Sequence, residues 1–244
     1  MQCPSFEGSM SESDQKKGLP HPIYDNDKTK NLIELPEFKN IIVKNNYVDL
    51  LLERKSERVF TNESITQEEL AFMLWSANGV HSTRGNGIST FRPVPSGGAR
   101  HPFEIYFIVQ NVEGLESGIY HYLPMHNIGE MKVTIERIGD LPEQTPDTIN
   151  ALVVGQKWAV KAPVLLFISC IPYRAEWRYN DAAHRVMLID LGHLGQNMML
   201  SATSLGLGSC CLAAYHQVKC DALFGFNGID EYIVYVLPFG NVKK

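Results

Sequence analysis

The chain contains 244 residues, of which 44% are hydrophobic, and its formal net charge is −5. The apolar content is enough for the core of one large domain or two small ones, and the negative balance argues against a general surface for nucleic acid or an anionic membrane. The five cysteines include one adjacent pair and no CxxC. This favours free thiols in a reducing cytoplasm over a disulfide framework or a zinc site, so we expect a cytoplasmic protein without a bound metal.

The first forty residues are polar and rich in lysine, aspartate and proline. This composition predicts an extended N-terminal arm over residues 1–40, followed by one folded domain over 41–244. No apolar segment stands near the start of the chain, so we expect no secretory signal. The longest apolar stretch, residues 186–207, contains Asp190 and other polar groups that would be costly in lipid, which speaks against a transmembrane span.

A basic segment, Arg54-Lys55-Ser56-Glu57-Arg58, follows a helical pattern of apolar residues over 47–54. If the chain is extended just after this helix, alternation places Arg54, Ser56 and Arg58 on one side. Their guanidinium and hydroxyl donors match the oxygens of a phosphate. The alternative is a solvated helix end at which the neighbouring glutamates pair with the arginines. The segment alone leaves both interpretations open.

Capping signals and periodicity predict the main helices and strands. Thr66-Gln67-Glu68-Glu69 is a capping box, and the helix that it opens should end near Asn78-Gly79. Residues 80–94 are expected to form a loop. The remaining segments with clear periodicity are predicted strands at 104–110, 118–123, 132–138, 164–169 and 232–237, and a long helix at 181–205. The mixed order of helices and antiparallel strands indicates an α+β fold and not a regular βαβ series.

The run from Pro95 to Pro102 is a turn of small residues between two prolines. Proline fixes φ, while Gly97 and Gly98 leave main-chain N–H groups uncovered. A flavin ring needs such donors at its N1/O2 and N5/O4 edges and free space above its face. The alternative is an ordinary surface turn before a strand.

Four polar residues lie at helical spacings on the long helix, namely Asp190, His193, Gln196 and Asn197. They could contact a ligand, or they could be satisfied polar groups at a contact between helices or subunits. The helix closes at Gly206-Leu207-Gly208-Ser209, which lacks a third glycine and is not a dinucleotide fingerprint. Small side chains just beyond it, over residues 211–214, would permit close approach of a flavin.

In their order along the chain, these segments resemble the nitroreductase-like flavoenzymes, and more closely the SagB-type (azoline) dehydrogenase branch. The resemblance covers about residues 45–240. It rests on the basic segment 54–58, the turn 92–99, the run Gly118-Ile119-Tyr120-His121-Tyr122, the helix from Asp190 to Gly208, and the ending Tyr235–Gly240.

The resemblance implies a nitroreductase-like α+β fold, with a central sheet of mainly antiparallel strands packed by helices. It also implies a homodimer with the long central helix at its interface and FMN between the subunits. Arg54, Lys55, Ser56 and Arg58 would hold the phosphate and ribityl chain, with Lys243 as a further basic group. The remaining implied contacts to the ring are Pro95, Ser96, Gly97 and Gly98 from the partner subunit, and Gln196, Cys211, Leu212, Ala213 and Ala214.

Azoline oxidases resemble one another in a Lys-Tyr pair ahead of the long helix, where this chain has Arg178-Tyr179. Arginine stays protonated, with a pKa above about 12, so it cannot take a proton as the lysine of that pair can, which weighs against azoline oxidation. The residues expected to act in catalysis are Tyr179, as a phenolate, and Arg178 beside it. The first expectation is a ping-pong oxidoreductase that passes a hydride through flavin N5 from NAD(P)H to a nitro- or quinone-type acceptor. Two alternatives stay open: a dehydrogenase that oxidises an azoline or peptide-derived substrate with O2 as acceptor, and a non-catalytic flavin-binding module.

Overall fold

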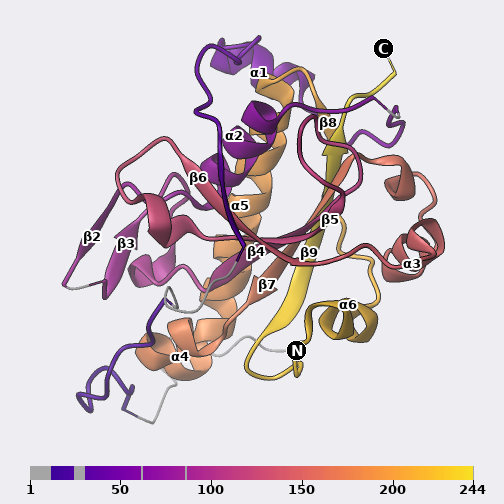
Figure 1. Ribbon diagram of the computed structural model, residues 1–244. Coiled ribbons are helices and arrows are strands. Elements are labelled where there is room, and N and C mark those ends of the chain that lie inside the picture. Colours follow the sequence, from indigo (N-terminus) through magenta and orange to yellow (C-terminus); the bar gives the residue numbers. More distant parts are fainter. Residues whose placement is uncertain (1–11, 25–30, 62, 86, 244) are drawn as a thin grey trace.

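The computed structural model describes residues 12–24, 31–61, 63–85 and 87–243 (Figure 1). Its centre is a seven-stranded sheet with the order β1-β6-β5-β4-β7-β9-β8, in which every neighbouring pair is antiparallel. The predicted α+β class is therefore confirmed. The strands are β1 (Leu32–Leu35), β4 (Phe103–Val109), β5 (Gly118–Tyr122), β6 (Val133–Gly139), β7 (Val164–Cys170), β8 (Gly208–Ser209) and β9 (Tyr232–Gly240).

Strand β7 lies inside the sheet and is buried on both faces. Leu166 belongs to the core on one face, and its neighbour Phe167 belongs to the core on the other. A strand covered on both faces needs apolar residues at every position, which explains its uninterrupted apolar run. All five predicted strands are present. β9 continues three residues further than predicted, because Phe239 and Gly240 pair with β8.

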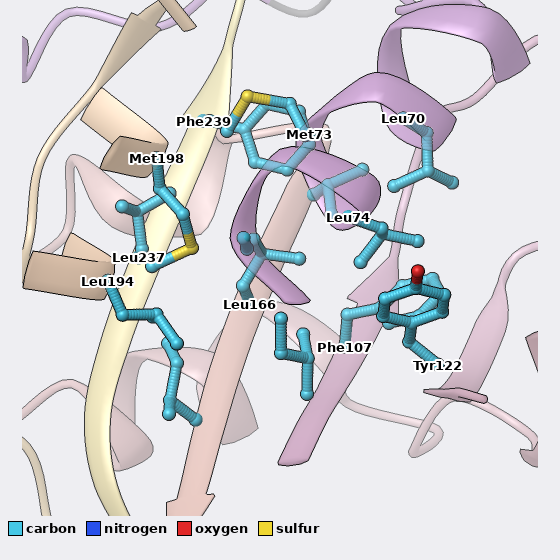
Figure 2. Close-up of a cluster of buried hydrophobic side chains, with 14 of the residues drawn as sticks. Leu70, Met73, Leu74, Phe107, Tyr122, Leu166, Leu194, Met198, Leu237 and Phe239 are labelled. Atoms are coloured by element: carbon cyan, nitrogen blue, oxygen red, sulfur yellow. The ribbon is translucent and has the colours of Figure 1, made fainter. Parts of the chain in front are cut away.

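Two helices, α2 (Gln67–Asn78) and the 22-residue α5 (Ala183–Ser204), pack on one face of the sheet. Helix α2 begins at the predicted capping box, where the Thr66 hydroxyl accepts the N–H of Glu69 and the Glu69 carboxylate accepts the N–H of Thr66. Figure 2 shows the core that results, with Leu74 of α2, Met198 of α5 and the strand side chains around them. The predicted long central helix is thus confirmed.

The opposite face of the sheet is covered by two short helices, α3 (Thr145–Leu152) and α6 (Gln217–Phe224). Phe224 of α6 packs against Phe167 of β7 with their ring centroids 5.2 Å apart. Cys220 and Ile149 are fully buried in the same cluster. The second core makes the molecule a three-layer arrangement of helices, sheet and helices.

The expectation of a loop over residues 80–94 is wrong, because a hairpin forms there: β2 (Ser82–Arg84) pairs with β3 (Ser89–Phe91). These strands are three residues long and largely exposed, so no alternation of apolar residues marks them. The remaining helices are α1 (Tyr47–Glu53) and α4 (Tyr173–Tyr179), with single 3-10 turns at Gly97–Ala99, Pro124–Asn127, Ala159–Lys161 and Asn180–Ala182.

The first described segment, residues 12–24, lies against α4. The N–H of Gln15 donates to the carbonyl of Trp177 at 2.8 Å, and the Trp177 indole donates to the carbonyl of Leu19 at 3.0 Å. Further along the predicted arm, β1 joins the edge of the sheet by pairing with β6. Across the described residues, none of the helices combines the length and apolarity that a membrane crossing demands.

Candidate functional site

The basic segment 54–58 leaves the end of α1 and runs extended beside β8. The N–H of Glu57 donates to the carbonyl of Ser209 at 2.9 Å, and Ser56 forms a parallel bridge with the same residue. The Arg58 guanidinium donates to the carbonyl of Ser56 at 3.2 Å and lies 5.7 Å from the centre of the Trp158 ring. The segment is therefore fixed through its main chain, while its side chains reach the surface.

The glutamates near this segment do not neutralise its arginines. Glu53 forms an ion pair with Lys44, and Glu57 pairs with Lys55 at 3.0 Å. Within the ranges that the structure describes, neither Arg54 nor Arg58 takes part in an ion pair. Their guanidinium groups can accordingly offer their charge to an anionic ligand.

The end of the chain completes this surface. The N–H of Lys243 donates to the carbonyl of Val59 at 3.2 Å, and the N–H of Thr61 donates to the carbonyl of Asn241 at 2.8 Å. The exposed Lys243 therefore lies next to Arg58 in the fold, although 184 positions separate Lys243 from Val59 in the sequence.

The segment that follows β8 lies beside the same surface. Leu212 exchanges hydrogen bonds with Val236 of β9 at 2.7 and 3.2 Å, which leaves Ala213 and Ala214 exposed. Burial raises the pKa of the Cys211 thiol to about 11, with Arg54 among the groups that oppose the shift. We name the exposed surface formed by residues 54–58, 211–214 and Lys243 the basic strip.

The close approach within the basic strip depends on Gly208. A Cβ at this position would lie 2.3 Å from Cγ1 of Val242 and 2.7 Å from Cβ of Glu57. We expect Gly208→Ala to lower the free energy of unfolding by about 1–3 kcal/mol, the usual effect of overpacking, in urea unfolding. Gly139→Ala is the matched control, because a Cβ there would meet only Cδ1 of Ile119, at an ordinary contact distance of 4.0 Å. Equal stability of the two variants would contradict the prediction.

The predicted turn at residues 95–98 is held against α5. Ser96 donates its hydroxyl proton to Oδ2 of Asp190 at 2.6 Å, and the N–H of Gly97 lies 3.1 Å from both carboxylate oxygens. Burial raises the pKa of Asp190, while these two donors oppose the shift. Asp190 is therefore hydrogen-bonded within the single chain, and its partners are Ser96 and Gly97 of the turn.

Pro95 and Gln196 line one cavity of about 190 Å³. Its other walls are Pro93, Val94, His193, Asn197 and Leu200. Asn197 is also bonded across to α2, because its side-chain amide donates to the carbonyl of Ser76 at 2.5 Å. The structure thus joins the predicted turn and the predicted polar face of α5.

Arg178 and Tyr179 lie at the end of α4, directly against this turn. A Cβ on Gly98 would be 2.7 Å from the Tyr179 hydroxyl and 2.6 Å from Cδ and Nε of Arg178. Arg178 also donates to the side-chain carbonyl of Gln15 at 3.1 Å. No sequence pattern marks Gln15 as a neighbour of this pair, because the contact spans more than 160 residues.

The basic strip and the turn 95–98 lie toward opposite ends of α5. Gly97 and Asp190 meet in the first half of the helix, whereas the basic strip lies near α1 and β8, at the other end (Figure 1). Next to Asp190, at the same end of α5 as the turn, Leu188 and Ile189 face solvent and are 59% and 53% exposed. Apolar side chains of this size on a central helix are typical of a contact surface.

A buried ionic cluster also lies on the interior strands β4 and β5, near α4. Arg174 forms an ion pair with Glu104, and Nε2 of His121 lies 3.7 Å from the second carboxylate oxygen. Tyr24 stacks over it, with the Arg174 and Arg92 guanidinium groups 4.4 and 5.2 Å from its ring centre. Sequence spacing did not reveal this cluster. Among the described residues, no three His, Cys, Asp or Glu side chains converge as metal ligands.

Comparison with known proteins gives a consistent result. A model of the Nitroreductase family matches residues 51–241. A predicted nitroreductase of Methanocaldococcus jannaschii is 33% identical over 208 residues, which make up 85% of this chain and 95% of that protein. The microcin B17-processing protein McbC of Escherichia coli is 30% identical over 132 residues, or 52% of this chain and 46% of McbC. The crystal structure of a predicted nitroreductase from Desulfovibrio desulfuricans in complex with FMN has a TM-score of 0.54 at 15% identity, covering 83% of this chain and 89% of that one.

Proposed function

The chain belongs to the nitroreductase family, and from this premise we propose that it is an FMN-dependent oxidoreductase that uses NAD(P)H to reduce a small nitro- or quinone-type acceptor. The proposal is carried by the guanidinium groups of Arg54 and Arg58, which have no ion-pair partner among the described residues. The main chain between them is fixed to β8 by the hydrogen bond from Glu57 to Ser209. A flavin mononucleotide has the dianionic phosphate that such a surface suits.

The residues of the basic strip fit FMN in chemistry as well as in charge. The Ser56 hydroxyl and the ammonium groups of Lys55 and Lys243 add donors for the phosphate and the ribityl chain. Ala213 and Ala214 are exposed and small, so a flat ring can approach their main chain. FMN, when bound, would accept a hydride at N5 and pass it on. The part left to the protein is to hold the ring, admit donor and acceptor in turn to one cavity, and exclude water.

A homodimer would complete this site. Helix α5 exposes Leu188 and Ile189, and no residue of α1 is buried in the single chain. Pairing two copies across α5 would cover this apolar surface. It would also let the turn 95–98 of one subunit reach the ring that the other subunit holds, which one chain cannot do with the two surfaces at opposite ends of α5.

The second candidate is a dehydrogenase that oxidises an azoline or peptide-derived substrate with O2 as acceptor. It is favoured by the match to McbC and by the position of Arg178 and Tyr179 against Gly98. In this case Tyr179 would take the substrate proton and the Arg178 cation would stabilise the phenolate, because arginine itself cannot act as a base. A third candidate is a flavin-binding module without turnover.

The absorbance spectrum of the purified protein, followed by anaerobic addition of NADPH and then NADH, tests these proposals. We expect flavin bands that bleach with one of the nicotinamides. Bands that persist with both would favour the dehydrogenase, and persistence with every donor would favour the non-catalytic module. If reconstitution with FMN yields no flavin bands, the proposed cofactor is wrong.

A further inference from the structure

The turn between Pro95 and His101 is tied to α5 by one buried carboxylate. Asp190 is 5% exposed, and both of its oxygens are engaged by the turn: Oδ2 accepts the Ser96 hydroxyl at 2.6 Å, and both oxygens lie 3.1 Å from the N–H of Gly97. The Ser96 oxygen in turn accepts the N–H of His101 at 2.9 Å. A charged acceptor therefore organises both ends of the turn from a rigid helix.

The turn needs such an anchor because its own conformation is unfavourable. Gly98, Ala99 and His101 all have positive φ, at 60°, 52° and 38°. For residues other than glycine this region is unfavourable, and it persists only where the surroundings impose it. Within the turn, two main-chain bonds contribute, from Ala99 to Ser96 at 3.0 Å and from Arg100 to Gly97 at 3.3 Å.

The same bonds decide which donors the turn can offer. The Ser96 hydroxyl has a single proton, which it donates to Asp190 in a hydrogen bond. The N–H of Gly97 is also committed to Asp190, and those of Ala99 and Arg100 bond within the turn. Over the part of the chain that the structure describes, the N–H groups of Ser96 and Gly98 make no hydrogen bond. These two main-chain donors are available to a ligand.

We propose that Asp190 is a positioning residue of the flavin site. It accepts hydrogen bonds from the Ser96 hydroxyl and the Gly97 N–H, and it thereby holds the strained turn in the conformation in which the main-chain N–H groups of Ser96 and Gly98 face the edge of the flavin ring. The Ser96 side chain then serves as a link between Asp190 and His101 and not as a donor to the ring. This inference rests on the proposed binding of FMN. It adds a residue on α5 that neither contacts the phosphate nor belongs to the turn.

Asp190→Asn in the FMN-loaded protein tests the proposal. The amide keeps an acceptor oxygen for the Gly97 N–H but replaces the charged acceptor of the Ser96 hydroxyl by an NH2 group, so the charge-assisted bond from Ser96 is lost. We expect FMN to dissociate about tenfold more readily, the visible flavin bands to shift, and the midpoint potential to change. Asp147→Asn, an exposed carboxylate on α3, is the matched control and should leave all three unchanged.

Ser96→Ala and Ser96→Thr separate positioning from folding. The alanine variant removes only the hydroxyl and should reproduce the shifted bands and potential, whereas threonine keeps the hydroxyl and should restore them. These variants also decide the matter if Asp190→Asn does not fold. The inference would be overturned if both Asp190→Asn and Ser96→Ala kept the FMN affinity, flavin bands and midpoint potential of the wild type. The proposed function would then still stand. A wild-type protein that takes up no FMN would overturn both.

Discussion

Replacing Arg174 by methionine lowers the free energy of unfolding by about 3–5 kcal/mol, measured by urea unfolding at pH 7. Arg174 and Glu104 are nearly inaccessible, with side-chain exposures of 6% and 10%, and they form an ion pair. Methionine fills a similar volume, but it leaves the Glu104 carboxylate buried without its cation. An uncompensated charge in this position is far costlier than the loss of a surface pair.

Two further variants show whether charge is the cause. Arg174→Met combined with Glu104→Gln should recover much of the lost stability, because position 104 then holds no buried carboxylate that lacks its cation. Lys39→Ala breaks the exposed pair with Glu37 and should change the free energy of unfolding by no more than about 0.5 kcal/mol. A single Arg174→Met variant that unfolds at the wild-type urea concentration would show that the pair contributes nothing.

The pH dependence of stability follows from the same pair. Burial alone raises the pKa of the Glu104 carboxyl, but Arg174 and His121 outweigh burial and lower it to about 2, from an ordinary value of 4.5. The contribution of Glu104 is therefore fully present above pH 4.5 and is lost as the pH falls toward 2. In Arg174→Met the pKa of Glu104 rises instead, so the acid-unfolding midpoint should move to higher pH.

Arg58→Ala weakens FMN binding by about 1.5–3 kcal/mol, the strength of one charge-assisted hydrogen bond. This corresponds to a rise of about 10- to 150-fold in the dissociation constant, measured by quenching of flavin fluorescence. The thermal stability of the FMN-free protein should change little, because the side chain is exposed and forms no ion pair among the described residues.

Arg84→Ala is the matched control for this prediction. Arg84 is an exposed arginine of the β2–β3 hairpin, away from the basic strip. Arg58→Lys should lie between wild type and alanine, since an ammonium keeps the charge but not the fork of donors. If purified Arg58→Ala carries as much flavin as the wild type, Arg58 does not hold the phosphate.

The sequence predicted those elements whose own residues determine them. β7 is apolar at every position because both of its faces are covered, and α2 begins where Thr66 and Glu69 cap each other. The hairpin β2–β3 and strand β8 were not predicted, because they are only two or three residues long and are defined by their pairing with neighbouring strands. Helices α3 and α6 are likewise short and depend on the second core.

The candidate site could be predicted in its parts but not in its assembly. Motif order indicated the basic segment, the turn and the small residues after α5, and their roles stay predictions. No spacing rule indicated that the main chain of Glu57 would bond to Ser209, or that Asp190 would accept a hydrogen bond from Ser96, 94 positions away in the sequence. Such contacts follow from the packing of the whole sheet, and periodicity reports only local geometry.

The pairing of Val59 with Lys243 and of Thr61 with Asn241 has a consequence for biosynthesis. The basic segment is translated well before the residues that fix it, which are Ser209 and residues 241–243. A nascent chain that ends before residue 243 therefore lacks the finished basic strip, even when α2 and the central strands have been translated. Cofactor capture would then have to wait until residue 243 has left the ribosome, however early the basic segment itself is translated.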